Sequence, residues 1–153
     1  MKAVVQRVTR ASVTVEGETV GAIGLGVLVL LGIEKGDLEA DLDATAERLA
    51  QFRMFTDESG RMNRSLADVG GAALVVSQFT LCADLRKGRR PSFDGAEEPG
   101  RARELVERFR AALERAGIAT QGGRFGASMQ VELLNDGPVT FVIEPRPRPG
   151  GQP

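Results

Sequence analysis

Hydrophobic and polar residues alternate along much of the first part of the chain, which is the pattern of half-buried β-strands. Ala11, Val13 and Val15 alternate with polar side chains, whereas residues 27–31 are hydrophobic without interruption. A strand without a polar face is typical of the centre of a sheet, where both faces are covered. We therefore predict four successive strands and place the fourth at the centre of the sheet: residues 4–9, 12–16, 19–23 and 27–33.

Two later segments repeat hydrophobic residues at intervals of three and four, which predicts amphipathic helices. Asp37 is a suitable N-cap for the first helix. Pro99 suits the first turn of the second helix, and Gly117 is suited to the position just after its end. The hydrophobic stripes consist of Leu38, Leu42, Ala46, Leu49 and Phe52 in the first helix and of Ala102, Leu105, Val106, Phe109, Leu113 and Ala116 in the second.

Further strands are predicted around and after these helices, at residues 72–76, 129–133 and 139–143. Strands, helix, strands, helix and strands in this order predict one mixed α/β domain, which we assign to residues 1–144. Residues 145–153 contain mostly Pro, Arg and Gly, a composition typical of a disordered or polyproline II tail.

The composition is that of an ordinary globular protein. The chain has 153 residues, 42% of them hydrophobic and 27% charged, which corresponds to one domain. No hydrophobic run approaches the roughly 20 residues of a membrane helix, and a charged residue comes too early for a signal peptide. We expect a cytoplasmic protein with no membrane partner. Cys82 is the only cysteine, and we expect it to be a small buried residue.

Histidine is absent from the chain, and this narrows the possible chemistry. Ser-His-Asp and Cys-His catalysis and the usual zinc sites all require imidazole. We therefore expect an activity without a metal or another cofactor. The formal net charge of −1 argues against a protein that coats nucleic acid, although the basic residues 86–90 could bind one RNA end.

Residues 77–80, Ser77-Gln78-Phe79-Thr80, bring two hydroxyls and an amide to the end of a predicted strand. One interpretation is that these groups only satisfy nearby backbone. The other is that they form the wall of an active site. Thr80 is a poor nucleophile without a neighbouring base, whereas the backbone N–H groups of Phe79 and Thr80 would suit a developing oxyanion.

Residues 135–140, Asn135-Asp136-Gly137-Pro138-Val139-Thr140, also allow two interpretations. Asp-Gly between two strands is a common signal of a type I′ hairpin. Pro138 argues against the hairpin, because a proline that opens a strand removes a backbone donor. The peptide bond that precedes a proline can be cis at modest cost.

Taken together, these two segments and the sequence around them resemble the D-aminoacyl-tRNA deacylases, and the resemblance extends from Lys2 to Glu144. It implies a three-layer α/β fold, with helices over one sheet that packs on a second sheet, assembled as a homodimer. It also implies a hydrolase that removes D-amino acids from the terminal ribose of tRNA, and glycine from a mischarged glycyl-tRNA(Ala), while sparing L-aminoacyl-tRNA.

The resemblance also assigns roles to particular residues. Gly137 and Pro138 are implied to form a cis pair that enters the partner subunit's site as a chiral filter, and Arg7 is implied to brace this pair. The residues implied to form the catalytic wall are Ser77, Gln78, Phe79 and Thr80. Those implied to line the pocket of the terminal adenosine are Phe125, Gly126, Ala127 and Met129. Without the resemblance, Phe125 and Met129 would be assigned to the core.

Several alternatives remain open at the level of the sequence. Either Thr80 or the 2′-hydroxyl of the tRNA itself could assist the reaction, and the missing histidine favours the hydroxyl. The chain could instead be a non-catalytic binder of charged tRNA ends, or a threonine-dependent hydrolase of small D-amino esters.

Overall fold

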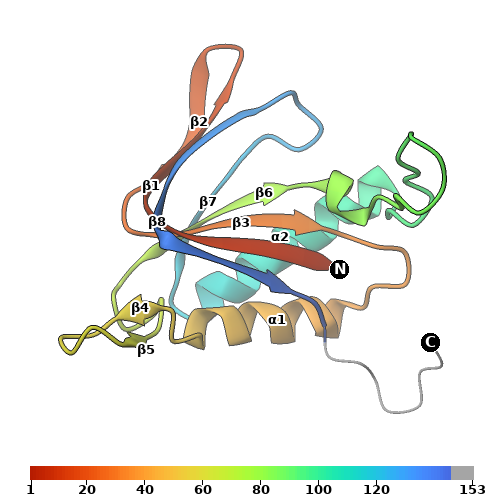
Figure 1. Ribbon diagram of the computed structural model, residues 1–153. Helices are drawn as coiled ribbons and strands as arrows, with labels where there is room; N and C mark the ends of the chain where they lie inside the picture. Colours follow the sequence, from red (N-terminus) through yellow and green to blue (C-terminus); the bar gives the residue numbers. More distant parts are fainter. Residues whose placement is uncertain (146–153) are drawn as a thin grey trace.

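A strongly bent β-sheet with two helices against one of its faces forms the fold of residues 1–145, the part of the chain that the computed structural model describes (Figure 1). Apart from its first residue, the predicted tail lies outside this range. The elements are β1 (Lys2–Val15), β2 (Glu18–Ile23), β3 (Gly26–Gly32), α1 (Glu39–Gln51), β4 (Phe55–Thr56), β5 (Met62–Arg64), β6 (Ala72–Ser77), the short 3-10 helix η1 (Phe79–Cys82), α2 (Pro99–Arg115), β7 (Ala119–Gly122) and β8 (Gln130–Ile143).

The main sheet has the strand order β2-β1-β3-β6-β7, and β8 pairs with β1. The pairs β3–β6 and β6–β7 are parallel, and the pairs that involve β1 are antiparallel. The prediction that residues 27–31 form a central strand is confirmed, because β3 lies in the middle of the sheet. Nearly all of its side chains are buried, as expected for a strand covered on both faces.

The long strand β1 bends, and its two halves pair with different strands of the sheet. Its residues 2–8 pair with β3, its residues 11–15 pair with β2, and β8 pairs with it from residue 3 to residue 14. The strands predicted at residues 4–9 and 12–16 are therefore one strand. The hairpin interpretation of Asp136-Gly137 is wrong for a similar reason. The segments on both sides of it belong to β8 and run antiparallel to β1 in the same direction.

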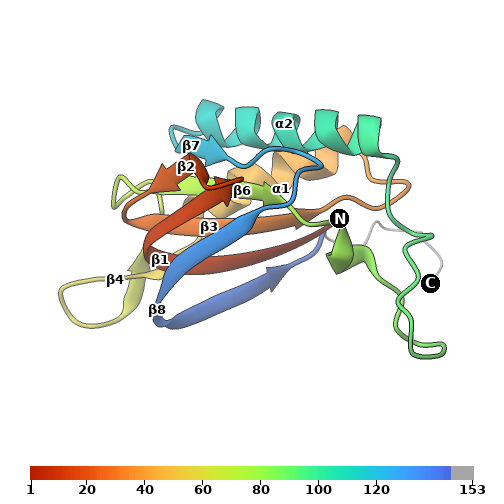
Figure 2. The same ribbon diagram turned by 90° about the horizontal axis from the view of Figure 1, so that it is seen from above.

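Two hydrophobic cores lie on the two faces of the sheet. The larger core joins α1 and α2 to one face, as the view in Figure 2 shows, and the smaller core fills the opposite face, where β2 and the first half of β8 fold over. The mixed α/β prediction is confirmed. The expected second sheet is not separate, however, because β1 and β8 continue from one layer into the other. Among residues 1–145, only the short pair β4–β5 forms a sheet of its own.

The helix-end residues predicted from the sequence are correct for α2 but not for the start of α1. Pro99 begins α2, and Gly117 follows its end with a φ of +88°, both as predicted. The predicted N-cap Asp37 is wrong, because α1 begins after Leu38. The carboxylate of Asp37 instead accepts a hydrogen bond from the Glu34 backbone N–H at 2.6 Å and so stabilises the preceding turn. Neither helix of the described residues combines the length and hydrophobicity that crossing a membrane requires.

Candidate active site

A cleft of about 470 Å³ opens beside the carboxyl ends of β3 and β6. Its lining comes from η1 and the residues before it, from the start of α2 and from the loop that leads to β8. The cleft brings together seven residues that the sequence assigned to the site: Ser77, Gln78, Phe79, Phe125, Gly126, Ala127 and Met129. Thr80 belongs to η1 but is not among the residues that line the cleft.

Hydrogen bonds and close packing hold η1 at the end of the central strand. The backbone N–H of Gln78 donates to the Leu31 carbonyl at 2.9 Å. A Cβ atom at Gly32 would lie 3.0 Å from the carbonyl oxygen of Gln78, so only glycine allows this approach without a shift. Cys82 is buried as predicted, burial raises the pKa of its thiol, and the thiol donates to the Ile33 carbonyl at 3.4 Å.

At the polar wall of the cleft, the backbone N–H groups are better suited to act on a substrate than the side chains are. The first N–H groups of a helical turn have no partner inside the turn, which leaves those of Phe79 and Thr80 available. Both residues are exposed, and Phe79 retains 57% of its accessible surface. The hydroxyl of Thr80 accepts a hydrogen bond from the Gln78 side-chain amide. An amide is not a base, so this contact does not activate Thr80 as a nucleophile.

The opposite wall of the cleft is largely apolar. Phe125 and Met129 are half-buried: each packs against a hydrophobic core and also lines the cleft, so the core assignment from residue type alone is only partly right. The guanidinium carbon of Arg103 lies 5.2 Å from the centre of the Phe125 ring, a cation–π contact that supports the ring. Gly123 provides space for Met129, since a Cβ there would lie 2.5 Å from the methionine sulfur.

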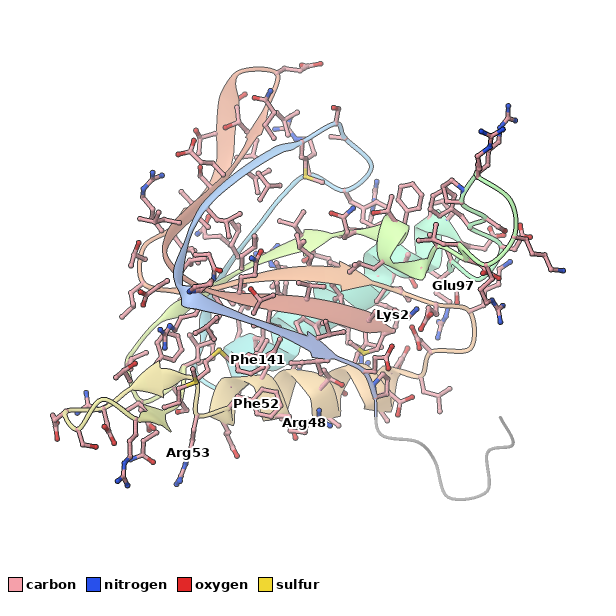
Figure 3. The ribbon with its side chains drawn as sticks, in the orientation of Figure 1. Lys2, Arg48, Phe52, Arg53, Glu97 and Phe141 are labelled. Carbon is pink, nitrogen blue, oxygen red and sulfur yellow. The ribbon has the colours of Figure 1, made fainter. Side chains whose placement is uncertain are left out.

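Two contributors to the cleft were missed by the sequence interpretation. Glu97 lines the cleft from the segment before α2 with a side chain only 12% exposed, and it pairs with Arg101 at 3.6 Å (Figure 3). Arg103 supports Phe125 from the first turns of α2. Neither residue carries a distinctive sequence signal, because charged residues are common on and around the exposed face of any helix.

Gly137 and Pro138 form the second part of the candidate site, on β8, and both are exposed. The peptide bond between them is cis, as predicted. Gly137 has a φ of +132°, and a Cβ at this position would lie 2.6 Å from a methyl carbon of Val139 and 3.3 Å from an Arg7 nitrogen. The local backbone therefore requires glycine.

Arg7 and Asn135 hold this segment from beneath. The buried guanidinium of Arg7 donates to the Asp136 carbonyl at 3.1 Å and to the Met54 carbonyl at 2.7 Å. Asn135 donates through its amide to the carbonyls of Arg7 and Val139, at 2.9 and 3.0 Å. The contact between Arg7 and the backbone of this segment agrees with the predicted brace. The sequence interpretation missed the hydrogen bonds of Asn135, although this residue belongs to the segment 135–140.

The two parts of the candidate site lie at opposite ends of the sheet in one chain (Figure 1). Gly137 lies at the level of Arg7, which pairs with Val27, whereas Ser77 pairs with Leu31 further along β3. Three strand spacings and four residues of strand rise separate the two regions by about 20 Å. One chain therefore does not bring Gly137 and Pro138 to its own cleft.

Known proteins resemble this chain over nearly its whole length. The model of the D-Tyr-tRNA(Tyr) deacylase family matches residues 4–144. A D-aminoacyl-tRNA deacylase from Roseiflexus castenholzii is 58% identical over 144 residues, which cover 94% of this chain and 92% of the relative.

Solved structures extend the comparison to the fold. One, titled c-Myc DNA Unwinding Element Binding Protein, has a TM-score of 0.88 and 44% identity over 96% of this chain and all of the other. A second, described as a probable eukaryotic D-amino acid tRNA deacylase, has a TM-score of 0.77 at 18% identity, over 93% of this chain and 97% of the other, and shares the fold. The resemblance seen in the sequence is confirmed, and the chain belongs to the D-Tyr-tRNA(Tyr) deacylase family.

Proposed function

We propose that this protein hydrolyses the ester bond between a D-amino acid and the terminal ribose of tRNA, and that it also removes glycine, as from glycyl-tRNA(Ala). Membership of the deacylase family and the name of the 58% identical relative support the reaction class. The observation that carries the proposal is one cleft that joins the residues at the start of η1 to an apolar wall.

The cleft suits the end of an aminoacylated tRNA. Its volume of about 470 Å³ lies within the range of small-molecule sites. The Phe125 ring offers a stacking face for a base, and Met129 adds an adaptable apolar surface. With the terminal adenosine between these side chains, the ester would lie toward Ser77, Gln78 and Phe79 on the opposite wall.

Catalysis in this proposal uses backbone rather than side-chain chemistry. The N–H groups of Phe79 and Thr80 stabilise the oxyanion that forms when water attacks the ester, an effect worth about 3–4 kcal/mol for one such donor in other enzymes. The neighbouring 2′-hydroxyl of the ribose positions the water and relays its proton to the departing 3′-oxygen, so that the amino acid and the free ribose hydroxyl are released. Thr80 is left to orient Gln78 through their hydrogen bond.

Gly137 and Pro138 act as the chiral filter in the proposal. Their carbonyl oxygens accept hydrogen bonds from the α-ammonium of the substrate while the wall fixes the ester. With both groups fixed, a D-amino acid turns hydrogen toward the backbone, whereas an L-amino acid turns its side chain there and clashes. Glycine carries hydrogen in both positions, so the filter accepts it.

The separation of the two regions in one chain leads to a homodimer with composite sites. Because about 20 Å lies between them, a filter that acts at the cleft must come from a second copy of the chain. The surface of β8 offers material for such an interface: Leu134, Phe141 and Val142 are 52%, 40% and 70% exposed. Isologous two-fold pairing would complete both sites at once.

The proposed function is tested with matched D-tyrosyl-, L-tyrosyl- and glycyl-tRNA. We expect rapid release of D-tyrosine and glycine and at least about a thousandfold slower release of L-tyrosine, which corresponds to about 4 kcal/mol. Release at equal rates would contradict the filter. Binding without release would favour a non-catalytic binder of charged tRNA ends, and hydrolysis of small D-amino esters that carry no nucleotide would favour a threonine-dependent esterase.

A further inference from the structure

Residues 84–92 form a closed loop, here called the basic arm, that projects from the cleft end of the molecule (Figure 1). Asp84 and Ser92 close its base through two backbone hydrogen bonds of 2.7 and 3.0 Å. Gly88 lies near its tip with a φ of +68°, a conformation that favours glycine. The arm is therefore a hairpin-like extension with a defined base.

The arm concentrates positive charge on a protein whose formal net charge is −1. Four cationic side chains fall within five residues, and all of them are exposed: Arg86, Lys87, Arg89 and Arg90. Asp84 is the only carboxylate of the arm. It pairs with Arg86 through contacts of 2.9 and 2.7 Å, which hold the pKa of Asp84 well below its ordinary value.

The other three cations of the arm are available to a ligand. Within residues 1–145, the salt bridges and side-chain hydrogen bonds of the protein do not include Lys87, Arg89 or Arg90. Exposed cations that cluster without acidic partners repel one another, and this repulsion is relieved when a polyanion binds. Nitrogen-tipped side chains extend outward from this end of the molecule in Figure 3.

The base of the arm is joined directly to the wall of the cleft. Phe93, just after the arm, packs edge-on against Phe79 of η1, with 5.0 Å between the ring centres. On the other side, η1 ends only two residues before Asp84. A ligand held by the arm therefore has a fixed position relative to the cleft.

We propose that the basic arm binds the sugar-phosphate backbone of the tRNA acceptor end, beyond the nucleotide that occupies the cleft, through Lys87, Arg89 and Arg90. This inference rests on the proposed function, because the cleft must hold the terminal nucleoside for the arm to meet the phosphates that follow it. A strand that leaves the cleft carries one negative charge per nucleotide, and charge of this kind contributes affinity without reading sequence.

The test compares two triple variants with equal changes in charge. The arm variant is Lys87→Gln/Arg89→Gln/Arg90→Gln. The control is Arg48→Gln/Arg53→Gln/Arg115→Gln, which removes three cations from α1, from the segment just after it and from the last residue of α2. Figure 3 shows Arg48 and Arg53 on the helix side of the molecule, away from the arm.

Steady-state deacylation of D-tyrosyl-tRNA is measured for each protein at several salt concentrations. We expect the arm variant to raise KM about tenfold or more at low salt, and to reduce the slope of log KM against log salt by about 2 to 3, because three phosphate contacts are lost. The kcat should remain within twofold, and the control should behave as wild type. Thermal unfolding checks that both variants are folded.

A substrate without phosphates separates the inference from the proposed function. For D-tyrosyl-adenosine, which fills the cleft alone, the arm variant should match wild type. Equal effects of the arm variant and the control on tRNA, or an unchanged salt slope, would overturn the role of the arm while leaving the deacylase activity intact. If wild-type protein cleaved neither substrate, the proposed function itself would fail.

Discussion

The polar wall of the cleft and the Gly137-Pro138 segment both present backbone atoms, but the molecule holds them in place in different ways. The wall follows the central part of the sheet, and backbone contacts to Leu31 and Gly32 fix it. The Gly137-Pro138 segment lies on β8, and the side chains of Arg7 and Asn135 fix it. Side-chain substitutions in the wall should therefore be tolerated better than substitutions in the brace of the second region.

The largest effect is expected when the substrate, rather than a side chain of the polar wall, is changed. Replacing the 2′-hydroxyl of the terminal ribose by hydrogen should lower kcat by about 10³-fold, because a positioned proton-transfer group is lost. Thr80→Ala should retain activity within tenfold. Single-turnover deacylation measures both. A folded Thr80→Ala protein without turnover, combined with unimpaired cleavage of the deoxy substrate, would return the nucleophile role to Thr80.

A substitution at Gly137 should displace the backbone of the Gly137-Pro138 segment. Gly137→Ala places a Cβ against Val139 and Arg7 at a φ that disfavours side chains, so the carbonyls of the segment must move. A displacement of about 1 Å at a substrate contact can cost about 10²-fold in rate, and we expect a loss of this size with D-tyrosyl-tRNA. Gly60→Ala is the control, since Gly60 also has a positive φ, has open space around its Cβ position and does not line the cleft.

Arg7→Lys tests the brace without removing its charge. A lysine offers one ammonium where the guanidinium reaches the carbonyls of both Asp136 and Met54. We expect about a tenfold loss of D-tyrosyl-tRNA deacylation and a lower Tm, because a buried carbonyl loses a partner worth about 1–3 kcal/mol. Arg10→Lys, at an exposed position of the same strand, should change neither quantity. Wild-type activity in Arg7→Lys would separate the brace from the reaction.

Mixing two impaired chains tests whether the two regions meet between subunits. Phe79→Pro removes one backbone N–H from the polar wall, and Gly137→Ala displaces the Gly137-Pro138 segment. After joint refolding, half of the dimers should be mixed and each should hold one intact site, which predicts recovery of about a quarter of wild-type activity. Sedimentation establishes the dimer, and subunit exchange is confirmed with a size tag. Complete exchange without recovery, or a fully active monomer, would exclude shared sites.

Local signals in the sequence were sufficient for much of the fold. The hydrophobic run in residues 27–31 located the central strand, and Pro99 and Gly117 marked the two ends of α2, because these features depend on neighbouring residues. Asp37 shows where local signals fail. Its carboxylate can cap a helix or a turn equally well, and here it binds the turn at Glu34.

Long-range pairing explains the remaining differences. Asp136-Gly137 carries the signal of a hairpin, yet β1 pairs with the chain on both sides of it, and no local pattern reveals a partner more than a hundred residues away. The same limit concealed Asn135 and Arg103, whose roles depend on contacts with Arg7 and Phe125. Family resemblance, rather than periodicity, assigned Phe125 and Met129 to the pocket.

The pairing of β1 with β8 also has a consequence for how the protein is made. Of the described strands, β1 is synthesised first and β8 last, yet they pair along almost their whole length. One edge of β1 therefore stays without its native partner while more than a hundred further residues are synthesised, and an unpaired edge of this kind can pair with other nascent chains. In the interval between translating β1 and β8, the growing chain is thus most exposed to such incorrect pairing.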